Sequence, residues 1–182
     1  LLDADGSQIR GDVRLTEMPD SQSKIPGIVW AEDGFGIVWT DLRNGLCGDV
    51  YFTTVDGDGV RSSSDVAVLA EPECQSGARH AWSGSEYGVV WVDSPAGAGG
   101  YTIQFARVSS QGEILHQTEI VGSEGGHYSE ISWSGSEYGI VWQAYEGDPE
   151  IFFTRISGQG DQVDAPIPLA ASSDALKQPD IA

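Results

Sequence analysis

The sequence contains few basic residues and little sulfur. Lysine occurs only at Lys24 and Lys177, and 9 Lys and Arg residues stand against 28 Asp and Glu residues, for a formal net charge of −19 in 182 residues. This balance argues against nucleic-acid binding through phosphate contacts, which requires a basic face. It also argues against attraction to an anionic membrane surface. No apolar run approaches the roughly 18 residues of a membrane-spanning helix, so we expect no membrane span.

Helical periodicity and the common enzyme motifs are absent as well. No segment keeps apolar residues at a spacing of about 3.6 over roughly ten positions, so no helix is predicted. There is no Gly-x-Ser-x-Gly elbow, P-loop or dinucleotide-binding fingerprint. The histidines, His80, His116 and His127, lack the spacing of zinc ligands. We therefore predict no catalytic residue. The alternative is a glycoside hydrolase or other hydrolase with an acidic site, although nothing singles out a pair of carboxylates.

What the sequence does contain is a repeat of about 51 residues, the kind of period found in stacked architectures. Three ten-residue segments match one another: WAEDGFGIVW, WSGSEYGVVW and WSGSEYGIVW. Each begins and ends with tryptophan, and the pairs are Trp30 and Trp39, Trp82 and Trp91, and Trp133 and Trp142. We expect all six tryptophans to have a packing role.

Each repeat holds four short segments rich in β-branched and aromatic residues, separated by clusters of Gly, Ser, Asp and Pro. This is the pattern of strands joined by turns. Four antiparallel strands in a period of about 50 residues are typical of one β-propeller blade. The predicted fold class is therefore all-β, a propeller with about 3.5 four-stranded blades in the chain.

The Trp-Ser-Gly-Ser-Glu-Tyr-Gly-Val-Val-Trp segment, followed by a Phe-Ala-Arg-Val strand and a polar Gly turn, resembles the tryptophan-rich propeller repeats of bacterial extracellular proteins. The resemblance covers essentially the whole chain. It implies a secreted or cell-surface protein and is specific for fold rather than for function. The Ser-x-Asp-x-Gly-x-Thr-Trp box of sialidases and the Gly-His and Trp-Asp signature of WD40 blades are absent.

The repeat also predicts how the chain is divided. Residues 1–20 are expected to form a partial blade, mainly its outer strand, residues 21–70, 71–121 and 122–172 three blades, and residues 173–182 the first strand of a further blade, all in one propeller domain. Open sheet edges of this kind favour pairing with another chain. Three alternatives remain: a homodimer that closes a ring of about seven or eight blades, further blades of a longer parent chain, or a single chain closed as a four-bladed ring.

Cys47 and Cys74 fall in two loops that lie on the same face of one predicted blade. A disulfide between them is expected, and it fits an oxidising, extracellular compartment. The alternative is two small residues with unrelated roles.

Two Asp-rich turns resemble the start of a calcium-binding loop. Asp56 and Asp58 form one pair, and Asp3 and Asp5 form the other. Calcium is bound by several oxygen ligands at alternate positions, so calcium is the one cofactor that the sequence suggests. The alternative is a hairpin turn with glycine at a position of positive φ, because other repeats have Ser and Gln at these positions.

Residues that depart from the repeat are the best candidates for ligand binding. His127, Tyr128, Tyr145 and Glu146 are expected in loops on the face that carries the cysteines. Aromatic rings stack on the C–H groups of sugars, and carboxylates accept hydrogen bonds. The sequence thus predicts a carbohydrate or protein ligand here; the alternative is an ordinary surface loop.

Asp41 and Arg43 form a second candidate for polar ligand contact. The alternative is an ion pair within one loop, in which Asp49 takes part. Together these features favour a non-catalytic extracellular scaffold or recognition module that self-associates through incomplete blades. The other possibilities are a hydrolase and a repeat fragment with no independent function.

Overall fold

The protein is all-β, as the sequence predicts. The computed structural model describes residues 4–16, 23–45, 47–69, 74–94, 100–145, 150–171 and 179–181. These residues form twelve strands and no helix. No helix long and apolar enough to cross a membrane occurs in this part of the chain.

The strands form three four-stranded antiparallel sheets, and each sheet is built from consecutive strands. Sheet 1 contains β1 (Ser23–Ala31), β2 (Gly34–Asp41), β3 (Asp49–Asp56) and β4 (Val66–Leu69). Sheet 2 contains β5 (Cys74–Trp82), β6 (Glu86–Ser94), β7 (Thr102–Ser109) and β8 (Ile114–Glu119). Sheet 3 contains β9 (Gly126–Trp133), β10 (Glu137–Ala144), β11 (Glu150–Ser157) and β12 (Ile167–Ala171).

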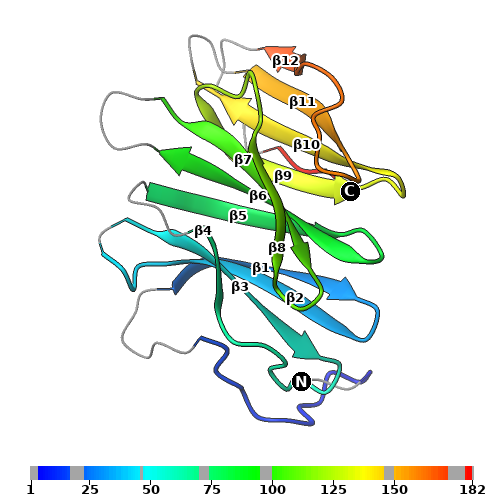
Figure 1. Cartoon of the computed structure of the whole chain (residues 1–182). Coiled ribbons are helices and arrows are strands. Elements are labelled where there is room, and N and C mark those ends of the chain that lie inside the picture. Colours follow the sequence, from blue (N-terminus) through cyan, green and yellow to red (C-terminus); the bar gives the residue numbers. More distant parts are fainter. Residues whose placement is uncertain are drawn as a thin grey trace.

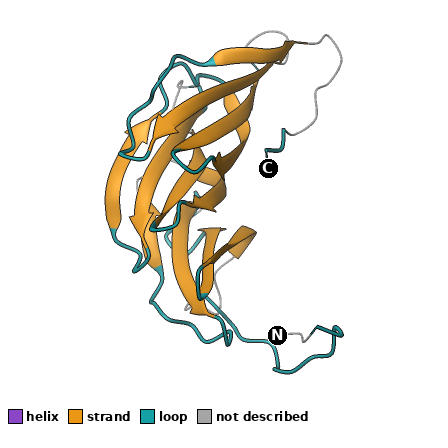
Figure 2. Cartoon of the chain, turned by 90° about the vertical axis from the view of Figure 1, so that its right-hand side faces the viewer, coloured by secondary structure: helices purple, strands orange, loops and turns teal. Residues whose placement is uncertain are grey.

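The sheets follow one another in an open stack (Figure 1). The first strands of successive sheets are neighbours, β1 beside β5 and β5 beside β9. Figure 2 shows that the stack curves and that both marked chain ends lie on its concave side. The described residues do not close this stack into a ring. Residues 4–16 and 179–181, where we expected an outer strand and a first strand, form no strand.

The hydrophobic core lies between the sheets. Trp91 and Trp142, in the middle strands β6 and β10, are fully buried, and Trp39 of β2 is nearly so. The first tryptophan of each pair is less buried: Trp82 and Trp133 are intermediate and Trp30 is exposed. The segments of β6 and β10 that end in Trp91 and Trp142 are apolar at consecutive positions, because both faces of each strand are covered.

An aromatic ring of one sheet packs onto a glycine of the sheet before it, and this contact occurs twice. An added Cβ at Gly36 would lie 2.3 Å from the Tyr87 ring, and one at Gly88 would lie 2.5 Å from the Tyr138 ring. These glycines occupy equivalent positions in β2 and β6, and the tyrosines occupy equivalent positions in β6 and β10. Glycine is needed at both places because any side chain would displace the ring.

Each first strand carries a β-bulge opposite the second tryptophan of its sheet. The strand registers shift opposite Trp39, Trp91 and Trp142, so that two residues face one. In each bulge one residue has positive φ, and these residues are Ile25 (53°), Gly77 (67°) and Tyr128 (49°). A bulge bends its strand and changes the direction of nearby side chains. The three bulges therefore place irregular backbone side by side on the neighbouring first strands β1, β5 and β9.

Candidate functional site

The bulges line a cleft of about 310 Å³ on the first strands of the three sheets. Its lining residues are Ile25, Ser76, Gly77, Arg79, Val92, Tyr101, His127, Tyr128, Ser129 and Glu130. A cleft of this size is at the lower end of the range for small-molecule sites.

His127 is the centre of an aromatic cluster at this cleft. Its ring centroid lies 4.0 Å from that of Tyr101, 6.2 Å from that of Tyr128 and 5.2 Å from that of Tyr145. The three tyrosines each expose between 43% and 48% of their surface, so their rings are available to a ligand. Partial burial lowers the pKa of His127 below its ordinary value. At neutral pH the imidazole is therefore uncharged and offers one hydrogen-bond donor and one acceptor.

Polar groups line the same cleft beside the rings. Arg79 Nε donates a hydrogen bond of 2.8 Å to Glu130 Oε1, and these two half-exposed residues occupy equivalent positions in β5 and β9. The hydroxyl of Ser129 is buried and has no hydrogen-bond partner within the described residues. A buried polar atom without a partner is costly. A ligand or water that reaches Ser129 can therefore form a hydrogen bond without breaking one within the protein.

The structure brings together three of the four residues that the sequence singled out on this face. His127 and Tyr128 lie within strand β9, not in the loop that the sequence suggested, because the strand begins at Gly126. Tyr145 directly follows β10 and contacts His127. Glu146 lies outside the described residues.

Sequence reasoning missed Tyr101, although a signal for it exists. Tyr101 directly precedes β7, and the residues directly before β3 and β11 are Gly48 and Pro149. A comparison of the repeats that began at this position would have shown an aromatic residue that breaks the pattern.

Asp41 and Arg43 belong to a buried network at the end of β2, and neither residue lines the cleft. Asp41 has no exposed surface, and its Oδ2 accepts hydrogen bonds from Trp39 Nε1 (3.0 Å) and Arg43 Nη2 (2.8 Å). Arg43 also donates to Asp65 Oδ2 (2.7 Å), and its guanidinium lies 3.9 Å from the centroid of the Tyr51 ring. The hydrogen bond to Asp41 is the main cause that raises the pKa of Arg43.

The ion pair that we expected within this loop is corrected in its third member. Arg43 pairs with Asp41 and Asp65 rather than with Asp49. Asp65, which follows β3 by nine residues, completes the network and also pairs with Arg61 at 2.6 Å. Asp49 instead accepts a hydrogen bond from Asn44. Because both charged groups of the Asp41–Arg43 pair are held by protein partners, the arrangement is that of a structural clamp.

Cys47 and Cys74 are joined in a disulfide, with their Cα atoms 4.4 Å apart. The bond links the loop after β2 to the first residue of β5, and so ties sheet 1 to sheet 2. Nearby, the backbone N–H of Gln75 donates to the carbonyl oxygen of Gly48 at 2.8 Å.

The Asp-rich turn at Asp56 has the hydrogen bonds of an Asx turn. Asp56 Oδ1 accepts from the backbone N–H groups of Asp58 (3.0 Å) and Val60 (2.7 Å). Ser109 and Ser157 accept the same pair of bonds in the equivalent turns of sheets 2 and 3. A hydroxyl thus replaces the carboxylate without loss of the turn, which is the hairpin interpretation.

The second Asp pair of the calcium hypothesis is described only in part. Asp5 is exposed, and Asp3 lies outside the described residues. Among the residues that the structure describes, no group of three or more His, Cys, Asp or Glu side chains could hold a metal ion.

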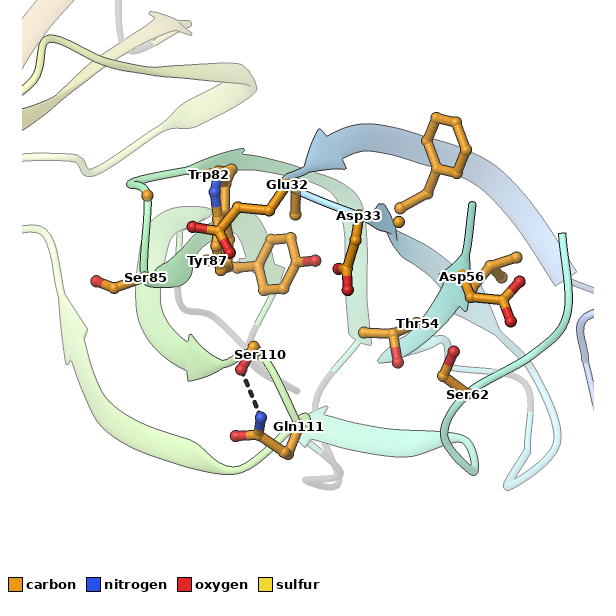
Figure 3. Close-up of a pocket in the computed structure, with 15 residues that line it drawn as sticks. Glu32, Asp33, Thr54, Asp56, Ser62, Trp82, Ser85, Tyr87, Ser110 and Gln111 are labelled. Carbon is orange, nitrogen blue, oxygen red and sulfur yellow. Dashed lines mark hydrogen bonds between the residues drawn. The ribbon is translucent and has the colours of Figure 1, made fainter. Parts of the chain in front are cut away.

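A second cavity, of about 420 Å³, lies between sheets 1 and 2 at the β1–β2 and β5–β6 turns (Figure 3). The labelled side chains in the figure include Glu32, Asp33, Trp82 and Tyr87. None of the residues that line it lines the cleft around His127.

Comparison with known proteins does not place the chain in a family. No family model matches the sequence, and no curated protein matches it.

Proposed function

We propose that the protein is a non-catalytic, propeller-type recognition module that binds a carbohydrate in the cleft around His127. The observation that carries this proposal is the convergence of Tyr101, Tyr128 and Tyr145 on one neutral imidazole, beside a buried hydroxyl without a partner. The hydroxyl of Ser129 forms no hydrogen bond to His127, so the hydrogen-bonded nucleophile and base of a covalent catalyst are not in place, and binding is the simpler role.

The chemistry of the cleft suits a sugar. The apolar C–H face of a pyranose ring packs on tyrosine rings. The Arg79–Glu130 pair and Ser129 supply charged and neutral groups that hydrogen-bond to sugar hydroxyls. The cleft is also small enough to hold about one or two sugar rings. An extracellular location fits this role, and the disulfide is consistent with an oxidising compartment.

A glycan array with the purified chain tests the proposal, followed by calorimetric titration of the best ligand. The informative variant is Tyr128→Gly, because Gly77 already occupies the equivalent bulge position and the backbone there has positive φ. The variant removes the ring and relieves the backbone, so it should fold and lose at least tenfold in affinity. Val121→Ser, an exposed substitution outside the cleft, should bind as the wild type does. An array without signal, or binding that survives Tyr128→Gly, would reject the site.

A second role, self-association, is favoured by the faces that the stack leaves open. Phe35 occupies in sheet 1 the position that Tyr87 and Tyr138 occupy in sheets 2 and 3. Gly139 occupies in sheet 3 the position of Gly36 and Gly88. The ring of sheet 1 thus has no glycine of a preceding sheet to pack on.

Phe35 and Gly139 are the two halves of the contact that neighbouring sheets make within the chain, and this favours a second copy as the partner. The outward face of sheet 1 carries a shallow cavity of about 310 Å³, which Ile28, Phe35 and Ile37 line together with residues 10–13 and Leu15 of the N-terminal segment. Leu15 already packs on part of this face. The atoms nearest to a Cβ at Gly139 are side-chain atoms of Phe153 and Ile181, at 3.2 and 3.3 Å, so Ile181 would have to move for the ring of another copy to pack there. We propose that sheet 1 of one copy packs on sheet 3 of another, which repeats the contact already made twice within the chain and extends the stack towards a propeller ring.

Light scattering at several concentrations tests this association. The wild type should have a mass that is a multiple of 19.4 kDa, and association should strengthen with salt because the copies repel each other through their net charge. Phe35→Ser should give a folded 19.4 kDa monomer. A wild type that stays monomeric at high concentration and high salt would contradict the proposal.

A further inference from the structure

The cavity between sheets 1 and 2 is acidic and contains no basic side chain. Glu32, Asp33 and Asp56 line it, and its described lining residues include no lysine, arginine or histidine. Asp56 is engaged by its own turn. Glu32 and Asp33 form no ion pair within the described residues. Figure 3 shows the Glu32 side chain beside Trp82 and the Asp33 side chain on the hydroxyl side of Tyr87.

The two free carboxylates are specific to this pair of sheets. The residues equivalent to Glu32 and Asp33 in the β5–β6 turn are Gly84 and Ser85. Glu32 has a φ of 53°, whereas Gly84 has a φ of 97° at the same turn position. Sheet 1 therefore carries a glutamate where the turn itself favours glycine.

An independent observation indicates a ligand at this place. Tyr87 exposes only 3% of its surface and lines the cavity, yet its hydroxyl forms no hydrogen bond within the described residues. Figure 3 shows this hydroxyl on the side of the ring that faces Asp33. Burial and the nearby Asp33 carboxylate raise the pKa of Tyr87 to about 12, so the phenol remains protonated and neutral at physiological pH.

The composition of the cavity distinguishes between kinds of cation. Calcium requires about six to eight oxygen ligands, and no cluster of three carboxylate, thiol or imidazole groups is present in the described residues. Two aromatic rings are present instead, since Trp82 and Tyr87 have centroids 4.6 Å apart. Aromatic faces beside carboxylates bind organic cations, and a guanidinium suits them best because it is planar and weakly hydrated.

We propose that this cavity binds the guanidinium or ammonium group of a basic peptide side chain, with Glu32 and Asp33 as its counter-ions, the partly exposed Trp82 ring as its aromatic wall and the Tyr87 hydroxyl as a hydrogen-bond acceptor. The volume of about 420 Å³ accommodates such a side chain with its adjoining backbone. The site is separate from the carbohydrate cleft and does not depend on it.

Titration with N-acetylarginine amide, followed by the NMR signal of the Trp82 indole N–H, tests the proposal. The neutral isostere N-acetylcitrulline amide is the ligand control. The arginine derivative should shift the signal in a saturable manner and bind at least tenfold more tightly than the citrulline derivative. Its affinity should fall as salt is added, because the carboxylates are exposed.

The informative variant is Glu32→Gly with Asp33→Ser, which gives sheet 1 the turn residues of sheet 2. It should fold, as thermal unfolding will verify, and bind the arginine derivative at least tenfold more weakly. Tyr87→Phe should weaken binding several-fold, whereas Tyr138→Phe, at the equivalent position of the next sheet, should leave it unchanged. Equal binding of citrulline, unchanged binding by the double variant, or the same signal shift with Ca²⁺ but not with arginine would overturn the proposal.

Discussion

The ring of Tyr138 occupies the space that a side chain at residue 88 would fill, 2.5 Å from the Cβ position of Gly88. Gly88→Ala should therefore force the tyrosine away from its place between sheets 2 and 3. Overpacking of a rigid interface costs about 1–3 kcal/mol. Denaturant unfolding should show a loss of free energy of this size.

The control for this substitution is Gly11→Ala. Nothing lies within 4 Å of the Cβ position of Gly11, and its φ is not positive. The free energy of unfolding should change by less than about 0.5 kcal/mol. Equal effects of the two substitutions would mean that the aromatic ring does not hold the sheets together.

His80 makes the contact between sheets 1 and 2 sensitive to pH. Its Nε2–H donates to the carbonyl oxygen of Gly36 at 2.9 Å, and burial lowers the pKa of His80 to about 4. In the unfolded chain the pKa is about 6.5. The folded state thus favours neutral His80, so its stability is intact above about pH 6.5 and falls as pH decreases towards 4, by up to about 3 kcal/mol.

Isoleucine is the matched replacement for His80, because Ile28 and Ile131 occupy the equivalent positions of β1 and β9. The difference in unfolding free energy between wild type and His80→Ile, measured from pH 7 to pH 4, cancels the titration of the other groups. It should shift in favour of the variant as pH falls. A difference that is independent of pH would show that His80 is not buried in this way.

The Asp41–Arg43 clamp should be a major source of stability in sheet 1. Asp41→Asn leaves the Arg43 guanidinium with its side chain only 11% exposed and one counter-ion fewer. Loss of one partner of a buried ion pair costs about 3–5 kcal/mol, and denaturant unfolding should show a loss in this range.

An exposed ion pair of the same chain provides the comparison for the clamp. Asp164 pairs with Arg155, and the two side chains are 52% and 44% exposed. Asp164→Asn should cost clearly less than Asp41→Asn, since solvent screens the exposed pair. A clamp substitution that is no more damaging than this one would indicate that Asp41 is solvated and available to a ligand.

The repeat in the sequence was sufficient to predict the all-β class and the grouping of consecutive strands into four-stranded sheets. The Gly-Ile-Val-Trp and Gly-Val-Val-Trp segments form the middle of β2, β6 and β10, where both faces are covered. Apolar residues at consecutive positions carry this information, because a strand with one solvated face would alternate.

The bulges and the exact membership of the cleft could not be predicted. Ile25, Gly77 and Tyr128 share a backbone conformation but no side-chain chemistry, and positive φ leaves no signal in Ile or Tyr. Tyr101 joins His127 only because strands β7 and β9 belong to neighbouring sheets. Such contacts depend on how sheets stack, which a single sequence does not specify.

A carbohydrate bound in the aromatic cleft around His127, as we propose, should perturb the residues that line this cleft. The most direct test is a two-dimensional NMR titration of the whole chain with the glycan selected on the array. The largest shifts should occur at Tyr101, His127, Tyr128 and Ser129, and they should disappear in Tyr128→Gly. Saturable shifts confined to other residues, or shifts that persist unchanged in this variant, would contradict the account.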